Sequence, residues 1–262
     1  FNRGGVVGGT RAGAAIMREP MIGAGNSMGA LRNGVKTNFE GEDFPESDGV
    51  LLTHGMGFFP LGMVDQHFNA RARLARLVMV MMHGNNAFRP GFGVDENTAL
   101  IYLGKQKQLK VAGAAGVTLV DASKATMVYR QNQPSVDNIM LSYLEGDIYD
   151  IETGKIIPAP GKKPTRNNEY YNTANPAQAG MFSGTATGFL NLITVSLIDN
   201  KAVEKVTNLN FTDSNHGFQV TLSKTPESKG FYTDKPDGNE HYTVTDIRMD
   251  ITPVLISVTP LH

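Results

Sequence analysis

Cysteine is absent from the 262 residues, which excludes disulfides, thiolate metal sites and a cysteine nucleophile. A net charge is nearly absent too: 24 basic side chains stand against 25 acidic ones, so we expect no nucleic-acid partner. The longest apolar stretch, residues 74–82, is far shorter than the roughly 20 residues needed to cross a bilayer. We therefore expect a soluble protein with no membrane span. Its compartment stays open, with a secreted or extracytoplasmic location favoured.

The length suits one large domain with a core, or a domain with a small appendage. Strands and helices alternate up to about residue 155. Residues 158–180 are rich in Pro, Asn and Lys, which is typical of a linker or lid. We therefore predict an α/β part over 1–157 and a β-rich extension over 181–262. The acidic segment EGEDFPESD and the asparagine-containing segment GNNAF lack the residue spacing of a calcium-binding loop. We therefore expect no metal and no cofactor.

Local patterns predict the individual elements. Asp65 is placed to cap the start of the strongest predicted helix. The predicted elements are a strand leading to residue 8, a short helix over 12–18, a loop over 21–49, a strand and turn over 49–60, a helix over 65–83, a turn into a strand over 91–103, a pair of strands over 116–122 and 125–130, a strand with a turn-rich connection over 138–157, and β-like segments over 189–199, 217–223 and 241–258.

The stretch GGVVGGTRAGAAIM, residues 4–17, reads as a strand, a tight turn and a helix. Such an elbow holds one side chain up at its tip, where a nucleophile would lie. Arg11 occupies that tip. An arginine stays protonated at any working pH and cannot attack a carbonyl.

Two further motifs complete a pattern of three. DQHF places His67 at a loop-to-helix junction, and GFGVDENTA places Glu96 in a glycine-rich turn before a strand. A tip residue, a histidine base and an orienting carboxylate are the parts of an acyl-transfer triad. Taken singly, the residues of these motifs have simpler interpretations. His67 suits a hydrogen-bonded structural histidine, Asp65 a helix cap, and the arginines at 71, 73 and 76 a solvated helix face.

In these motifs the sequence resembles the cyanophycinase group of serine peptidases, over roughly residues 4–155. There the elbow reads Gly-Gly-Thr-Ser-Ala-Gly-Ala, the base lies in Asp-Gln-His-Phe before an arginine run, and the acid is the Glu of Gly-x-Asp-Glu-Asn-Thr-Ala. The resemblance implies a flavodoxin-like α/β fold of the class I glutamine amidotransferase-like kind, with a parallel sheet. It also implies hydrolysis of β-linked aspartyl-arginine polymer or related β-aspartyl peptides.

The resemblance assigns roles residue by residue. His67 matches the base, Glu96 the orienting acid, Arg11 the nucleophile position and the Ala12 amide an oxyanion donor. The residues that match the substrate pocket are Thr10, Asp65, Gln66, Arg71 and Arg73.

Two departures from the family pattern change the expected activity. With Arg11 at the tip we expect an inactive hydrolase; the neighbouring hydroxyl of Thr10 should point away from the site, and a single base change could turn a serine codon into this arginine. The chain also opens only a few residues before the elbow, so the resemblance implies a sheet incomplete at its N-terminus, with the missing part cleaved, absent or supplied by a companion chain. The alternative function is that of a pseudoenzyme, which acts as a binding or structural protein in a homo-oligomer or together with that companion chain.

Overall fold

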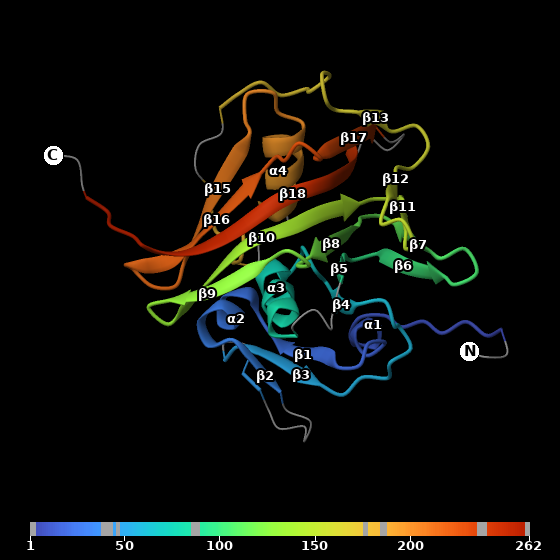
Figure 1. Cartoon of the computed structure of the whole chain (residues 1–262), viewed down its shortest axis with the longest axis horizontal. Coiled ribbons are helices and arrows are strands. Elements are labelled where there is room, and N and C mark those ends of the chain that lie inside the picture. The colour runs from blue at the N-terminus through green and yellow to red at the C-terminus, as the bar shows by residue number, and fades with distance from the viewer. Residues whose placement is uncertain are drawn as a thin grey trace.

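A computed structural model describes residues 4–37, 44–45, 48–84, 90–174, 178–183, 188–234 and 240–259. It is a mixed α/β structure in which strands predominate and the sheets are open, as Figure 1 shows. The described helices are α1 (Ala12–Ala15), α2 (Ser27–Asn33), α3 (Leu74–His83) and α4 (Gly188–Ile193), the last continuing into a π-helical turn, Thr194–Ile198. The expected α/β class with a β-rich C-terminal part is confirmed, but the β-like segment predicted over 189–199 is wrong, since α4 and the π-helical turn occupy it.

The strands form three sheets within the described residues. A small sheet has the order β1-β3-β2, and another has the order β12-β11-β7-β6. The large sheet runs β14-β15-β16-β18-β10-β8-β5-β4, with β9, β13 and β17 paired beside this path. The strands are β1 Met21–Gly25, β2 Val35–Thr37, β3 Val50–Thr53, β4 Met63–Gln66, β5 Gly91–Val94, β6 Thr98–Leu103, β7 Gln108–Gly113, β8 Val117–Asp121, β9 Thr126–Arg130, β10 Gln133–Leu144, β11 Ile148–Asp150, β12 Ile156–Ile157, β13 Lys163–Pro164, β14 Gln178–Ala179, β15 Lys205–Phe211, β16 His216–Ser223, β17 Lys229–Asp234 and β18 Glu240–Leu255.

Parallel pairing occurs in three described ladders, β2–β3, β4–β5 and β14–β15, and in an isolated bridge between Tyr171 and Asn200. The other described ladders are antiparallel. Among them, β6–β7, β9–β10, β11–β12, β15–β16 and β17–β18 join consecutive strands through short connections, which an antiparallel pair allows and a parallel pair does not. The β4–β5 crossover contains helix α3. The longest ladders join β18 to β10 and β16, so strands from both sides of the 158–180 segment share one sheet.

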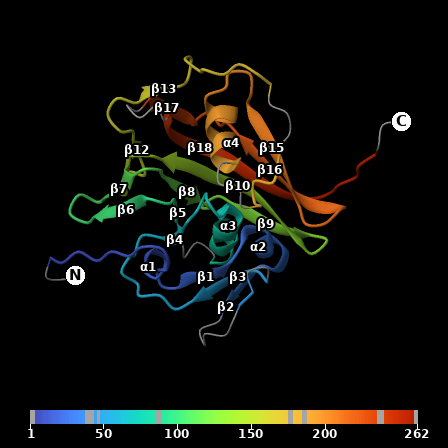
Figure 2. The same ribbon diagram turned by 180° about the vertical axis from the view of Figure 1, so that it is seen from behind.

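Helix α3 lies at the centre of the molecule. Figures 1 and 2, seen from opposite sides, both place it between the small β1-β3-β2 sheet and the large sheet. Its residues from Leu74 to Met81 are buried, and all of them except Arg76 are apolar, as expected of a helix enclosed by the core. The main core joins this helix to β10, β18 and α4.

Local sequence explains the ends of α2. The Asn26 side chain accepts a hydrogen bond of 2.7 Å from the Gly29 backbone N–H, which caps the helix N-terminus. Gly34 follows the helix with a φ of 73°, a conformation that glycine adopts without steric cost. These signals lie inside the range 21–49 that sequence predicted as a loop. That prediction is wrong, since β1, α2 and β2 occupy it; the short strands become stable only through pairing with β3.

The predicted helix over 65–83 is correct only from residue 74 onward. Residues 63–66 form strand β4, and Asp65 lies in that strand rather than at a helix cap. His67 and Ala72 have positive φ values of 47° and 48°, which a right-handed helix excludes. The apolar side chain of Phe68 fits the helical spacing but packs beside Gly93 of β5.

The segment before Arg11 also differs from expectation. Residues 5–10 form no strand in the described structure, and Val6 is 98% exposed. Two valines between glycines offer little apolar area to bury. The predicted strands 116–122 and 125–130 both form, as β8 and β9, but each pairs with β10 instead of with the other.

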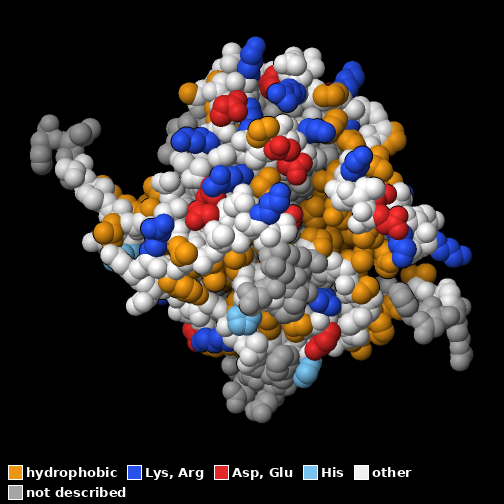
Figure 3. Space-filling model, in the orientation of Figure 1, with side chains coloured by type: hydrophobic (Ala, Val, Ile, Leu, Met, Phe, Trp, Pro, Cys, Tyr) orange, Lys and Arg blue, Asp and Glu red, His pale blue; other side chains and the backbone are white. Residues whose placement is uncertain are grey.

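Two observations concern the surface. Within the described residues, the longest helices fall short of the length and apolarity that a bilayer crossing requires. Figure 3 shows basic and acidic side chains interspersed over the visible face, as the balanced composition predicts.

Candidate active site

A histidine and a glutamate from separate motifs meet at one edge of the large sheet. The Nδ1 atom of His67 lies 2.6 Å from Oε1 of Glu96, within hydrogen-bond distance. The side chain of His67 is 19% exposed and that of Glu96 is 51% exposed, so the pair is open to solvent. A hydrogen bond to Nδ1 leaves Nε2 as the second functional atom of the imidazole.

The parallel ladder between β4 and β5 explains why the two residues meet. Gln66, the last residue of β4, pairs with Val94, the last residue of β5. His67 therefore follows one strand and Glu96 follows the next by two residues. Carboxyl ends of neighbouring parallel strands are a common place for ligand sites in α/β proteins.

The backbone is strained at His67. Its φ of 47° lies in the left-handed region, which is uncommon for residues other than glycine. Such conformations cost on the order of 1–3 kcal/mol and persist where surrounding contacts hold them. Here the Phe68 N–H donates to the Val94 carbonyl at 3.2 Å, which continues the strand pairing past His67.

Arg11 lies at a tight turn that opens helix α1. Its φ is 55° and its ψ is −125°, a combination that is sparsely populated for any residue but glycine. A Cβ atom on Gly9 would lie 1.9 Å from the carbonyl oxygen of Gly13, so the turn requires glycine at position 9. Helix α1 packs against β4, the strand that leads to His67.

The side chain at the turn is directed to solvent. Thr10, Arg11 and Ala12 are all exposed. Among the residues that the structure describes, no carboxylate lies within ion-pair distance of the Arg11 guanidinium. Arg11 is therefore exposed to solvent and forms no ion pair with Glu96.

Asp65 is fully buried and bound by an arginine. Arg76 donates from Nε to Oδ2 at 2.7 Å and from Nη2 to Oδ1 at 2.5 Å, and its Nη1 donates to the Gly25 carbonyl at 2.5 Å. This bidentate pair joins β4, α3 and the end of β1. Because both carboxylate oxygens are occupied, Asp65 faces Arg76 and not the solvent.

The arginine run divides by burial. Arg73 and Arg76 are buried, so the solvated helix face considered from sequence is wrong for them. Arg73 donates from Nη1 to the Gln66 carbonyl at 2.6 Å and so braces the end of β4. Arg71 is exposed, and its backbone N–H donates to the His67 carbonyl at 3.1 Å. The Gln66 Oε1 atom is buried with no hydrogen-bond partner among the described residues.

Asp95 was not singled out from sequence although it stands next to Glu96. Its carboxylate accepts from the backbone and side chain of Asn69 and from the Tyr143 hydroxyl. Burial raises the pKa of Asp95 above its ordinary value, against the opposing effect of these donors. Burial, followed by the Asp95 charge, also raises the pKa of Tyr143. The sequence signal that could have identified Asp95 is its position directly before Glu96 in the GFGVDENTA motif.

Comparison with known proteins gives one consistent result. No family model matches the chain. The chain is 34% identical to the cyanophycinase of Synechococcus elongatus over 157 residues, 58% of this chain and 44% of that protein. It is 33% identical to the cyanophycinase of Geminocystis herdmanii over 153 residues, 56% of this chain and 50% of that protein. For the cyanophycinase of Trichormus variabilis the identity is 34% over 166 residues, 60% of this chain and 50% of that protein.

The matches cover more than half of this chain, and the chain spans about half the length of these curated relatives. The part that matches is long enough to hold both partners of the His67–Glu96 pair, which lie 29 residues apart in the sequence. The chain is thus similar to cyanophycinases over the larger part of its own length.

Proposed function

We propose that this chain carries the base and the orienting acid of a peptidase-like hydrolase site for β-aspartyl-arginine peptides, and that it binds such peptides without cleaving them. The observation that carries the proposal is the 2.6 Å contact between His67 Nδ1 and Glu96 Oε1. In acyl transfer, a carboxylate on one imidazole nitrogen fixes the tautomer, and the other nitrogen takes the proton of an attacking hydroxyl. His67 has this arrangement at an open edge of the sheet.

The missing group in this proposal is the nucleophile. Arg11 has the strained turn that suits a residue at a nucleophile elbow, with α1 directly after it and the Ala12 N–H among those left unpaired at the start of a helix. A guanidinium at this place can neither lose a proton to His67 nor attack a carbonyl. Loss of a triad nucleophile reduces the rate by roughly a million-fold.

The similarity to proteins named cyanophycinase supports a peptide of aspartate and arginine as the ligand. Within the predicted pocket, Arg71 is exposed and its guanidinium suits a peptide carboxylate. The amide oxygen of Gln66 is buried and lacks a hydrogen-bond partner among the described residues, so we assign it no contact with the peptide. Asp65 and Arg73 we assign to the framework that holds β4 and α3, and Thr10 to the rim beside Arg11.

An assembly belongs to the same proposal. We propose a homo-oligomer, or a complex with a companion chain, as the setting in which a binding protein of this kind acts. Native mass spectrometry of the intact protein tests both. A single monomeric species across micromolar concentrations would overturn this part of the proposal.

Replacement of Arg11 by Ser in the intact protein tests the function. We expect release of arginine from a β-aspartyl-arginine dipeptide by the Arg11→Ser variant, at least about a thousand-fold faster than by the parent, because a hydroxyl then lies at the tip. Arg11→Ala is the matched control, since it removes the guanidinium without adding a hydroxyl. The double variant Arg11→Ser with His67→Ala should lose the gained activity.

Two outcomes would contradict the proposal. Comparable hydrolysis by the parent would place the nucleophile elsewhere. Equal rates for Arg11→Ser and Arg11→Ala would show that His67 does not serve a hydroxyl at position 11. Because Arg11 is exposed, these substitutions should leave the fold intact, which circular dichroism can check.

A further inference from the structure

Asp95 and Glu96 are adjacent carboxylates with opposite environments. The side chain of Glu96 is half exposed and reaches His67, whereas Asp95 is 8% exposed and points into the protein. The turn that carries them ends with Asn97 at a φ of 54°. One turn therefore provides a carboxylate to the solvent side and another to the interior.

The interior carboxylate is bound to the loop that carries His67. The Asn69 backbone N–H donates to Asp95 Oδ1 at 3.0 Å, and the Asn69 Nδ2 atom lies 2.8 Å and 2.9 Å from the two oxygens. Asn69 is buried and stands two residues after His67. Hydrogen bonds to a buried ionised acceptor are among the stronger ones in proteins.

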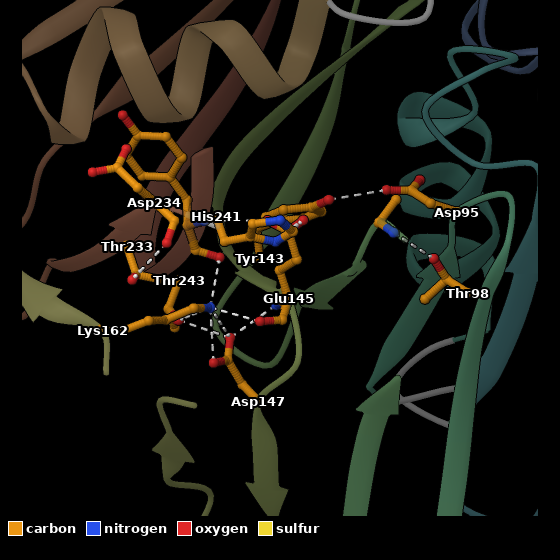
Figure 4. Close-up of polar contacts among 12 residues, drawn as sticks. Asp95, Thr98, Tyr143, Glu145, Asp147, Lys162, Thr233, Asp234, His241 and Thr243 are labelled. Atoms are coloured by element: carbon orange, nitrogen blue, oxygen red, sulfur yellow. Dashed lines mark hydrogen bonds and ion pairs between the residues drawn. The ribbon is translucent and has the colours of Figure 1, made fainter. Parts of the chain in front are cut away.

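A third residue anchors this pair to the centre of the large sheet. The Tyr143 hydroxyl, from β10, lies 3.3 Å from Asp95 Oδ2, and Figure 4 shows the phenol directed at the carboxylate. Tyr143 is itself 3% exposed. Asp95 thereby links the His67 loop on one side with a long central strand on the other.

These contacts explain how the strained backbone at His67 is maintained. The loop is held directly after His67 by the bond from Phe68 N–H to the Val94 carbonyl and by the bonds from Asn69 to Asp95. Without Asp95, the Phe68 contact with Val94 and the His67–Glu96 contact itself would remain, of the bonds described above, between the loop and the turn of Glu96. A φ of 47° would then be free to relax, and the imidazole would move relative to Glu96.

We propose that Asp95 is a positioning residue for the His67–Glu96 pair, acting through Asn69. It binds no substrate. Its role is to hold the loop so that Nδ1 of His67 stays within hydrogen-bond distance of Glu96. The inference rests on the proposed function for its catalytic meaning, but its structural content is testable without any hydrolysis.

The test is nuclear magnetic resonance of the intact protein with ¹⁵N-labelled histidine. His67 is assigned with a His67→Gln variant, and the Nδ1 proton and the nitrogen titration are followed with pH. We expect a hydrogen-bonded Nδ1 proton in the parent, which Glu96→Gln removes. In Asp95→Ala this proton should exchange with water roughly tenfold faster, the effect expected when one or two hydrogen bonds that hold the site are lost.

Related variants separate positioning from general damage. Asn69→Ala should reproduce the effect of Asp95→Ala, while Tyr143→Phe, which removes one long hydrogen bond, should have a smaller effect. Asp95→Asn keeps one oxygen for the Asn69 backbone and should restore part of the slow exchange. Asp147→Asn disturbs another buried carboxylate and should leave the His67 signal unchanged.

A folded Asp95→Ala or Asn69→Ala variant with the parent's His67 signal would overturn the inference. If Asp95→Ala does not fold, Asn69→Ala and Asp95→Asn decide, because an unchanged His67 signal in both excludes the role. A changed signal in these variants together with an inactive Arg11→Ser variant would support the positioning role and reject only the proposed hydrolase site.

Discussion

Burial decides what each carboxylate near β4 and β5 does. Asp65 is fully buried and accepts hydrogen bonds from Arg76. Asp95 is buried and accepts hydrogen bonds from Asn69. Glu96 is exposed and lies within hydrogen-bond distance of His67. The three side chains have almost the same chemistry. Motif spacing could therefore select the residues, but the division of roles depends on tertiary contacts.

The Asp65–Arg76 pair leads to the first stability prediction. Asp65→Asn leaves the Arg76 guanidinium buried without its counter-charge, and breaking a buried pair in this way costs about 3–5 kcal/mol of unfolding free energy. Urea denaturation followed by circular dichroism measures it.

The matched control is a surface pair. Glu204 lies 3.9 Å from Lys224 and its side chain is 82% exposed, so Glu204→Gln should change the stability by less than about 1 kcal/mol. Similar losses for the two variants would contradict the view that burial makes the Asp65 pair strong.

At the scale of elements, the close approach of β5 to the His67 loop depends on a missing side chain. A Cβ atom on Gly93 would lie 2.3 Å from the ring of Phe68, which is fully buried. The ring thus occupies space that only glycine leaves open. The GFG sequence of β5 is required for the β4 end and the loop to pack here.

We expect Gly93→Ala to destabilise the protein by about 1–3 kcal/mol through overpacking, and to disturb the His67–Glu96 contact. Thermal denaturation gives the first effect, and the His67 nitrogen signals give the second.

Gly13→Ala is the corresponding control in α1, where an added Cβ meets nothing within 4 Å. In the Gly93→Ala background, Phe68→Leu should recover part of the loss because the smaller side chain makes room. A Gly93→Ala variant as stable as the parent would show that the β5 backbone can shift away from Phe68.

The same elements mark how far sequence could predict the structure. The apolar pattern of residues 74–83 predicted α3 correctly. The DQHF and GFGVDENTA motifs predicted that His67 and Glu96 form a base and its orienting acid. The helix predicted over residues 65–73 was wrong, because β4 pairs with β5, which is distant in sequence, and this pairing overrides the helical spacing of the apolar residues. The strands within 21–49 were missed for the same reason, since glycine-rich segments gain strand structure here only beside β3.

At the scale of the whole molecule, a buried ammonium group ties the segment after β12 to the large sheet. Lys162 Nζ lies 2.9 Å from Asp147 Oδ1 and 2.7 Å from Thr243 Oγ1, and it donates to the Glu145 carbonyl at 2.6 Å. Figure 4 shows these groups converging on the lysine. The 158–180 segment is therefore fixed at this point by charge as well as by the short strand β13.

Lys162→Met should lower the free energy of unfolding by about 3–5 kcal/mol, because Asp147 then remains buried without a cation. It should also speed proteolysis within residues 158–174. Limited trypsin digestion with mass spectrometry, beside thermal denaturation, measures both effects.

The adjacent Lys163 is exposed, so Lys163→Met serves as the control and should match the parent in stability. Equal protease sensitivity of the two variants would mean that the segment is held by its backbone contacts alone.

The pairing of β10 with β18 has a consequence for how the chain reaches its structure. Val136 pairs with Ile251, so the centre of the large sheet joins segments more than a hundred residues apart. Such a high contact order slows folding, because the entropy of closing a long loop is lost before the ladder forms. During synthesis, the ladder between β10 and β18 cannot form until β18 has left the ribosome. Until then the edge of β10 that pairs with β18 has unpaired backbone groups, which favour aggregation, and the time that residues 240–255 take to emerge sets the length of that exposure.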